Sequence, residues 1–289
     1  MRNYALSYDK TRWKEKAPTP INTLQIFITN KCNMRCKACF YAHNLGRKEL
    51  SFKNYKKILL KYSRKIRKVI ILGGEPTLYK NLNKVIDFNT SLGLRTTVYT
   101  NGFHLKILKN VDLSKTTIRI GVYGAELSEK PLEDVPYVPF PVTIVYMLRK
   151  DNVKELMKAA KMAEERFNCQ KFYISSIRDI TITHDYWKDT KETLPLNEYY
   201  KVIQKFLKNY NGNIKEIHLA KRGVITTQKN SASVNKCRFG NIFPDTRKII
   251  CPLDISKQVY TEELKFNKRF CNKNKECILQ KIILKRVNP

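Results

Sequence analysis

Residues 24–39, with the sequence LQIFITNKCNMRCKAC, join a short apolar strand to three closely spaced cysteines. The expected strand covers Leu24–Thr29, and Cys32, Cys36 and Cys39 follow it with the spacing C-x3-C-x2-C. Cysteine thiolates are the usual ligands of iron–sulfur clusters, and a [4Fe–4S] cluster normally takes four of them. Three thiolates without a fourth cysteine nearby in the sequence therefore predict a cluster with one iron open to a substrate or cofactor.

Two other interpretations of this cysteine trio carry less weight. A tetrahedral structural zinc site would be incomplete with three thiolates. Buried core cysteines are common in proteins, but the trio follows a strand and lies among Lys31, Arg35 and Lys37. Core packing does not require this spacing either, so the pattern favours the cluster.

Strand and helix patterns alternate after the trio. Apolar residues at helical spacing, with Ser51 as the N-cap, predict a helix over 52–66, and Gly93 predicts the end of a second one over 82–92. The other expected elements are strands over 69–72, 95–100, 116–122, 142–148, 171–176 and 214–219, and helices over 152–167 and 195–210. This order indicates βαβ units and a parallel sheet. The units are too few for an eight-fold barrel of about 250 residues, so the expected fold class is α/β with a partial, open-sided (β/α)6 barrel.

Two glycine-containing turns follow the second and third expected strands, Gly73-Gly74-Glu75-Pro76 and Thr100-Asn101-Gly102. In a parallel α/β barrel the loops after the strands form the functional face. The trio after the first strand, together with the Gly73–Pro76 turn after the second, resembles the radical S-adenosylmethionine (SAM) superfamily. The resemblance extends over about residues 24–219 and includes the Thr100–Gly102 turn.

This resemblance implies a [4Fe–4S] cluster held by Cys32, Cys36 and Cys39, with SAM bound to the open iron. The Gly73–Pro76 turn would meet the methionyl amino group of SAM, its glycines permitting close approach. Reduction by an electron donor such as flavodoxin or ferredoxin would cleave SAM, and the resulting 5′-deoxyadenosyl radical would abstract a substrate hydrogen. The family usually has an aromatic residue just before the last cysteine, where this chain has Ala38. The expected cofactor-binding residues are Phe40, Gly73, Gly74, Glu75, Pro76, Thr100, Asn101 and Ser175.

Four more cysteines lie near the C-terminus, at Cys237, Cys251, Cys271 and Cys277. The first two flank an expected hairpin with a turn over 243–246 and a strand over 248–250. This arrangement resembles the SPASM and Twitch auxiliary-cluster domains of radical SAM enzymes, which implies a second [4Fe–4S] cluster. Zinc is the alternative, because four cysteines also complete a tetrahedral zinc site. The expected domains are an N-terminal extension over 1–23, the barrel over 24–220 and a small cysteine-rich auxiliary-cluster domain over 221–289.

The chain is strongly basic, with 56 Lys and Arg against 25 Asp and Glu and a formal net charge of +31. Such a charge fits a nucleic-acid partner, but a genome biased toward Lys, Asn, Ile and Tyr is the favoured explanation, and the charge alone does not decide between them. No apolar run approaches the ~18–20 residues needed to cross a bilayer, and the N-terminus lacks the apolar segment of a secretory signal. We therefore expect a cytoplasmic protein with no membrane partner.

No catalytic side chain stands out from the sequence. Cys169 is a weak candidate for a hydrogen donor, and a buried structural thiol is the favoured interpretation. The favoured hypothesis is an enzyme that modifies a peptide or protein side chain by oxidation, cross-linking or epimerisation. The alternatives are sugar or aminocyclitol dehydrogenation, a nucleotide rearrangement, modification of RNA, and a non-enzymatic iron–sulfur or zinc module.

Overall fold

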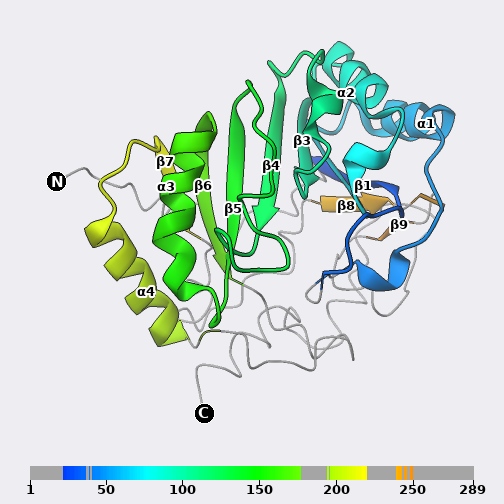
Figure 1. Ribbon diagram of the computed structural model, residues 1–289. Coiled ribbons are helices and arrows are strands. Elements are labelled where there is room, and N and C mark those ends of the chain that lie inside the picture. The colour runs from blue at the N-terminus through cyan, green and yellow to red at the C-terminus, as the bar shows by residue number, and fades with distance from the viewer. Residues whose placement is uncertain are drawn as a thin grey trace, which may run out of the picture.

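The computed structural model describes residues 22–36, 39, 41–176, 194, 196–219, 239–242, 244–245 and 248–249. Within them nine strands form one sheet in the order β7-β6-β5-β4-β3-β2-β1-β8-β9. The strands are β1 (Thr23–Thr29), β2 (Lys68–Gly73), β3 (Arg95–Thr100), β4 (Thr116–Val122), β5 (Val142–Leu148), β6 (Cys169–Ser176), β7 (Glu216–Leu219), β8 (Phe239–Ile242) and β9 (Lys248–Ile249). All neighbours from β1 to β7 pair in parallel, so the predicted open, parallel α/β sheet is confirmed (Figure 1).

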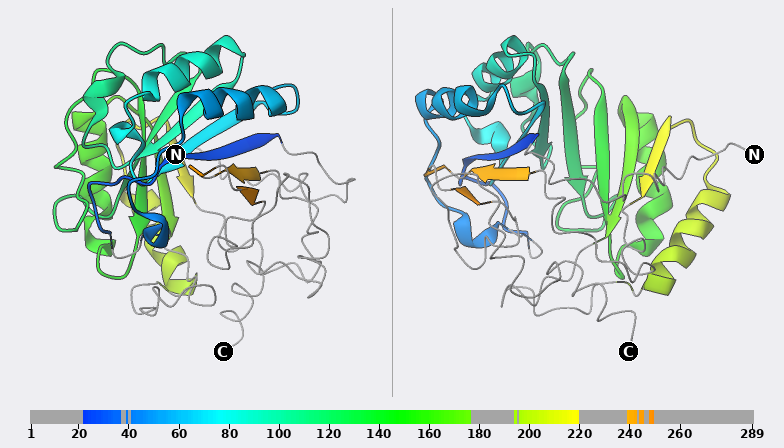
Figure 2. Two further views of the ribbon diagram at one scale, coloured as in Figure 1. Left: turned by 90° about the vertical axis from the view of Figure 1, so that its right-hand side faces the viewer. Right: turned by 180° about the vertical axis from the view of Figure 1, so that it is seen from behind.

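The described α-helices lie on the outer face of the curved sheet (Figures 1 and 2). They are α1 (Phe52–Tyr62), α2 (Leu82–Ser91), α3 (Leu156–Arg166) and α4 (Leu196–Asn209). Short 3-10 helices occur at η2 (Ala42–Asn44), η3 (Pro76–Leu78), η4 (Leu105–Leu108) and η5 (Val153–Glu155). The strand–helix–strand repeat lacks an α-helix at two crossovers. β3 connects to β4 through η4, and β4 connects to β5 through a loop without a helix.

The helix ends follow local hydrogen bonding. Ser51 caps α1 as predicted, and its hydroxyl accepts a hydrogen bond from the Asn54 amide at 3.2 Å. This helix ends at Tyr62, before the predicted residue 66, because the amides of Lys65 and Ile66 both donate to the Tyr62 carbonyl and close the chain into turns. Gly93 ends α2 as predicted, with the positive φ of 72° that favours glycine.

The predicted C-terminal hairpin is present, and it adds to the barrel sheet. β8 pairs in parallel with β1, from Thr23 opposite Phe239 to Ile26 opposite Ile242. β9 then pairs antiparallel with β8. This part of the predicted auxiliary domain therefore extends the barrel at the edge formed by β1.

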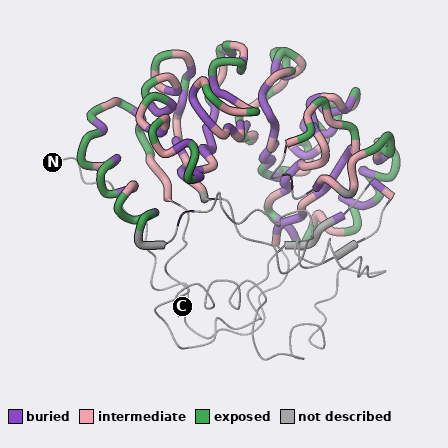
Figure 3. Tube along the Cα trace, turned by 60° about the horizontal axis from the view of Figure 1, so that its bottom comes forward, coloured by how far each residue is buried: buried purple, intermediate pink, exposed green. Residues whose placement is uncertain are grey.

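The two faces of the sheet have different chemistry. Alternate strand residues point outward and join the helices in one core, as Ile118 and Ile120 of β4 do. The opposite, inner face has a small apolar cluster in which Phe27 stacks on Tyr41 with ring centroids 4.7 Å apart. It also carries polar and aromatic side chains from β3 to β7. Buried residues follow the strands and exposed residues the outer sides of the helices (Figure 3).

None of the helices in the described part of the chain combines the length and the apolar character needed to span a membrane.

Candidate functional site

The cysteine trio lies in the loop that follows β1, at the carboxyl edge of the sheet. Cys32, Cys36 and Cys39 are partly buried free thiols, and the amide of Cys39 donates to the Cys36 carbonyl at 3.2 Å. Burial raises the pKa of all three thiols, that of Cys36 to about 11. The charges of Cys39 and Cys32 add to the rise at Cys36, so the three sulfurs act on one another. The structure thus brings the predicted ligands together in one loop.

These residues fit an iron–sulfur cluster. Three cysteines from one loop supply the soft thiolate ligands that such clusters take, and metal binding favours the thiolate form that burial alone disfavours. Among the described residues, no three His, Cys, Asp or Glu side chains are grouped closely enough to enclose a single metal ion.

The Gly73-Gly74 pair packs against the backbone of the cysteine loop. A Cβ atom on Gly73 would lie 2.4 Å from the Thr29 carbonyl oxygen, and one on Gly74 would lie 2.2 Å from the Lys31 carbonyl oxygen. The close approach that these glycines permit is thus between two loops of the protein. The predicted contact of this turn with the amino group of SAM stays a prediction.

Glu75 joins the ends of β2 and β3. Its side chain is 1% exposed, and one carboxylate oxygen accepts hydrogen bonds from the Thr77 amide at 3.0 Å, the Thr77 hydroxyl at 2.7 Å and the Thr100 hydroxyl at 2.6 Å. The other oxygen accepts from the Asn101 amide at 2.7 Å. Both oxygens are therefore engaged within the protein, while Pro76, also buried, begins η3. These contacts give Glu75 a positioning role.

Asn101 links the third strand to the cysteine loop. Its side-chain amide donates to the Asn33 side-chain oxygen at 2.7 Å, between the first two cysteines of the trio. Its own side-chain oxygen accepts from the Phe103 amide at 3.1 Å. The three predicted turns, after β1, β2 and β3, are thus tied together by direct hydrogen bonds.

The loop between β4 and β5 brings a cation to the trio that is not among the predicted site residues. Lys130 is partly buried, and its charge opposes the rise that burial causes in the pKa of each of the three cysteine thiols. Its Nζ also lies 5.7 Å from the ring centroid of Tyr123, whose other cationic neighbour is Arg149 at 5.6 Å. No periodic pattern covers this loop, so the sequence held no signal for the position of Lys130.

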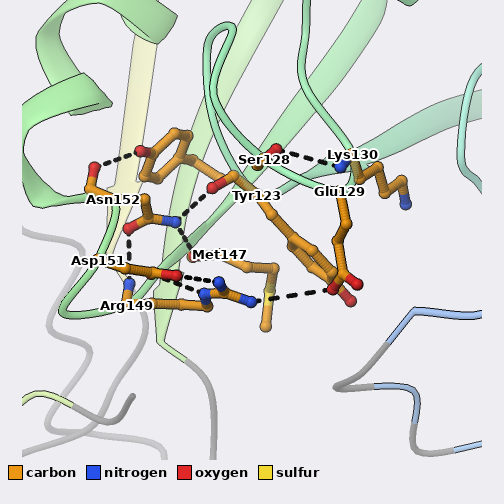
Figure 4. Close-up of polar contacts among 9 residues, drawn as sticks. Tyr123, Ser128, Glu129, Lys130, Met147, Arg149, Asp151 and Asn152 are labelled. Carbon is orange, nitrogen blue, oxygen red and sulfur yellow. Dashed lines mark hydrogen bonds and ion pairs between the residues drawn. The ribbon is translucent and has the colours of Figure 1, made fainter.

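A hydrogen-bond network holds the loops after β4 and β5 in place (Figure 4). The Asn152 side chain donates to the carbonyls of Tyr123 and Met147 and accepts from the Arg149 amide at 2.7 Å. The Arg149 guanidinium donates to Asp151, with Nε at 2.8 Å, and forms an ion pair with Glu129. The loop that carries Lys130 is therefore anchored on both sides.

The remaining predicted residues lie at different ends of the sheet. Ser175 is near the carboxyl end of β6, opposite Met147, on the same edge as the trio. Cys169 is the first residue of β6, at the opposite end. Its sulfur donates to the Lys171 carbonyl at 3.3 Å, and burial raises its pKa to about 11. This position argues against a hydrogen-donor role and fits a buried structural thiol.

Several predicted residues lie outside the described residues, namely Phe40, Cys237, Cys251, Cys271 and Cys277.

Several curated relatives each match part of the chain. A protein from Methanocaldococcus jannaschii, assigned by its name to the glycyl-radical enzyme activating enzymes, is 33% identical over 104 residues, which cover 33% of this chain and 38% of the relative. The S-adenosylmethionine-dependent nucleotide dehydratase of Selenomonas ruminantium is 32% identical over 81 residues, covering 27% and 29%. The GTP 3′,8-cyclase of Aquifex aeolicus is 29% identical over 130 residues, covering 40% of each. The chain thus spans between 29% and 40% of the length of these relatives.

The fold is shared with a solved structure, that of Streptococcus suis SuiB bound to S-adenosylmethionine. The two superpose with a TM-score of 0.66 at 15% identity, over 84% of this chain and 63% of SuiB. The radical SAM superfamily profile matches residues 26–194, from β1 to the segment before α4. By this match, and by the cysteine loop that the turns after β2 and β3 hold in place, the chain belongs to the radical SAM superfamily.

Proposed function

We propose that this protein is a radical SAM enzyme whose cluster is held by Cys32, Cys36 and Cys39. When bound, the [4Fe–4S] cluster would supply the electron that cleaves SAM. The resulting 5′-deoxyadenosyl radical would abstract a hydrogen from the substrate. The observation that carries this proposal is that hydrogen bonds join the loops after β1, β2 and β3. Glu75 and Asn101 fix the turns after β2 and β3, and those turns fix the backbone of the cysteine loop.

The protein's own side chains position the loops of the site and set the charge around the cysteines. Lys130 places a positive charge beside three thiolates, which favours their ionised form. The buried Glu75 carboxylate keeps the donors of Thr100 and Asn101 occupied and so holds their turn in one conformation. We propose that an electron donor such as flavodoxin or ferredoxin supplies the reducing electron.

For the substrate we propose a peptide or protein side chain. The cysteine-rich C-terminal pattern supports this class, because it resembles the auxiliary-cluster domains of enzymes that act on peptides. A small anionic molecule such as a nucleotide is the second candidate. It is favoured by the curated relatives named as GTP 3′,8-cyclases, one of which matches 64% of this chain at 24% identity.

We further propose that Cys237, Cys251, Cys271 and Cys277 hold a second [4Fe–4S] cluster, with zinc as the alternative. The support is the number of cysteines and the β8–β9 hairpin between the first two. Four thiolates would fully ligate such a cluster, so its role would be electron transfer or shaping of the open side of the barrel.

The test is anaerobic reconstitution of the full chain, followed by assays for iron, sulfide and zinc and for 5′-deoxyadenosine formed from SAM under reduction. Two clusters predict about 8 Fe per chain, and about 4 in the variant with Cys32, Cys36 and Cys39 changed to Ala. We expect the triple variant to form no 5′-deoxyadenosine and the Cys169→Ala control to match wild type. Iron-free wild-type protein, or SAM cleavage that survives in the triple variant, would contradict the proposal.

A further inference from the structure

Arg119 projects from the middle of β4 onto the inner face of the sheet. Its neighbours Ile118 and Ile120 point into the outer core, so the alternation of the strand turns Arg119 the other way. The guanidinium lies between two tyrosine rings, 4.7 Å from the centroid of Tyr99 and 4.9 Å from that of Tyr173. Its Nη1 also donates to the Tyr99 hydroxyl at 2.6 Å. Three contacts therefore fix the plane of this cation.

No carboxylate balances the charge of Arg119 among the residues that the structure describes. The Glu216 carboxylate on β7 is occupied by Lys171 at 2.8 Å and His218 at 2.6 Å. Glu75 is engaged by hydrogen bonds of its own. Burial lowers the pKa of Lys68 and the charge of Arg119 adds to that lowering, so Lys68 is a neighbour of like charge.

The hydrogen-bonding capacity of Arg119 is only partly used. A guanidinium carries five N–H donors in a planar fork, and the described residues accept from Nη1 alone. The Nε atom is buried without a hydrogen-bond partner. Removing a cation from water without an anionic partner is costly. The Arg119 guanidinium is held rigidly, is partly desolvated and has no carboxylate partner among the described residues, so it is suited to bind an anion.

We propose that Arg119 binds an anionic group of the substrate, a carboxylate or a phosphate, on the inner face of the sheet. This inference rests on the proposed function and names the chemistry of its substrate. Carboxylates and phosphates both match the guanidinium fork. A peptide would offer an acidic side chain or its terminus, and a nucleotide would offer its phosphates.

The site is distinct from the cysteine trio. Arg119 lies before the end of β4, whereas the trio lies in the loop beyond the end of β1. The cations that act on the thiols include Lys130 and Arg35, and Arg119 is not among them. An anion at Arg119 would therefore sit deeper along the strands than a ligand of the cluster.

Calorimetric titration of the reconstituted full chain with pyrophosphate and, separately, with succinate tests the proposal. The buffer contains about 0.15 M salt, which screens the exposed cations of this basic chain more than a partly buried one. Wild type is compared with Arg119→Met, which keeps an apolar stem between the two rings, and with Arg64→Met, which removes an exposed cation in the turn after α1.

We expect saturable binding of one of the two anions, weakened about tenfold or more in Arg119→Met and unchanged in Arg64→Met. Preference for pyrophosphate would assign a phosphate-bearing substrate, and preference for succinate a carboxylate-bearing one. No saturable binding to wild type, or equal affinity in Arg119→Met, would overturn the inference.

If Arg119→Met does not fold, Arg119→Lys is used in its place. Lysine keeps the positive charge but lacks the planar fork of the guanidinium, so the same weakening of anion binding is expected. SAM cleavage by wild type is measured in parallel. Its absence would overturn the proposed function alone, since anion binding is recorded independently of the reaction.

Discussion

Gly74 packs so closely on Lys31 that a Cβ atom at position 74 would lie 2.2 Å from the Lys31 carbonyl oxygen. The amide of Glu75 donates to that same oxygen at 2.7 Å, and the amide of Gly74 donates to the Thr29 carbonyl at 2.8 Å. The turn after β2 thus sets the path of the chain into the cysteine trio, which begins at the next residue, Cys32.

Gly74→Ala should therefore damage the cluster site. The added methyl group meets backbone, which cannot move aside without displacing the cysteine loop, and such overpacking costs about 1–3 kcal/mol. We expect a lower free energy of unfolding and less iron retained per chain after desalting. Gly46→Ala is the control. Gly46 lies in the connection between β1 and α1 that carries the cysteine trio, and no atom lies within 4 Å of a Cβ placed there. Equal losses in both variants would contradict the argument.

Glu75→Gln should destabilise the fold although it is nearly isosteric. The amide nitrogen of glutamine donates, and every group facing the two oxygens of Glu75 is itself a donor, among them Thr100 and Asn101. At least one buried donor loses its acceptor, at a cost of about 2–3 kcal/mol. Denaturant unfolding measures this cost. The exposed Glu133→Gln should match wild type, and a Glu75→Gln protein of unchanged stability would rule out this role.

The sequence was sufficient to predict the parallel sheet and to single out the cysteine loop after β1, because both leave signals in the linear sequence. Strands buried in a parallel sheet read as continuous apolar runs, as Val69–Leu72 does, and the trio is defined by spacing alone. The Gly73-Gly74 pair was predicted to approach SAM closely, which stays a prediction, and the sequence did not indicate that both glycines also pack against protein backbone. That backbone is the loop of Thr29–Lys31.

The two cations of the inner face were not predicted, for different reasons. Lys130 lies in a loop without periodicity, where only the folded backbone determines what the side chain meets. Arg119 did leave a signal, since an arginine between Ile118 and Ile120 must point away from the core that they share. Its tyrosine partners come from β3 and β6, which are distant in the sequence and meet only in the sheet.

Glu155→Gln should loosen the start of the β4–β5 loop. The Glu155 carboxylate accepts hydrogen bonds from the backbone amides of Ala125 at 2.6 Å and Leu127 at 3.0 Å. A neutral amide accepts these bonds more weakly, so exchange of the two amide hydrogens should accelerate roughly tenfold. Hydrogen exchange with mass spectrometry measures the change. Glu165→Gln, exposed on α3, serves as the control, and identical exchange in the two variants would refute the anchoring role.

Cys169 should make the stability of the protein depend on alkaline pH. Burial raises its pKa from 9.0 to about 11, so the unfolded chain releases this proton at lower pH than the folded one. The contribution is fully present below pH 9 and is lost as the pH rises toward 11, up to about 3 kcal/mol in all. The difference in unfolding free energy between wild type and Cys169→Ala should therefore shrink over that interval. A difference independent of pH would contradict the buried-thiol assignment.

Lys130→Met should make the cluster harder to reduce. Burial raises the pKa of all three thiols of the trio and the charge of Lys130 opposes that rise, so this positive charge stabilises negative charge at the site. Adding an electron to a cluster increases its negative charge, and loss of a nearby cation disfavours that step. We expect a more negative midpoint potential in a redox titration followed by electron paramagnetic resonance, together with lower iron retention. Lys130→Arg should restore most of the potential, since it returns the charge, and Lys57→Met on the exposed side of α1 should leave it unchanged. A potential that does not move in Lys130→Met would show that the lysine positions the loop and does not act through its charge.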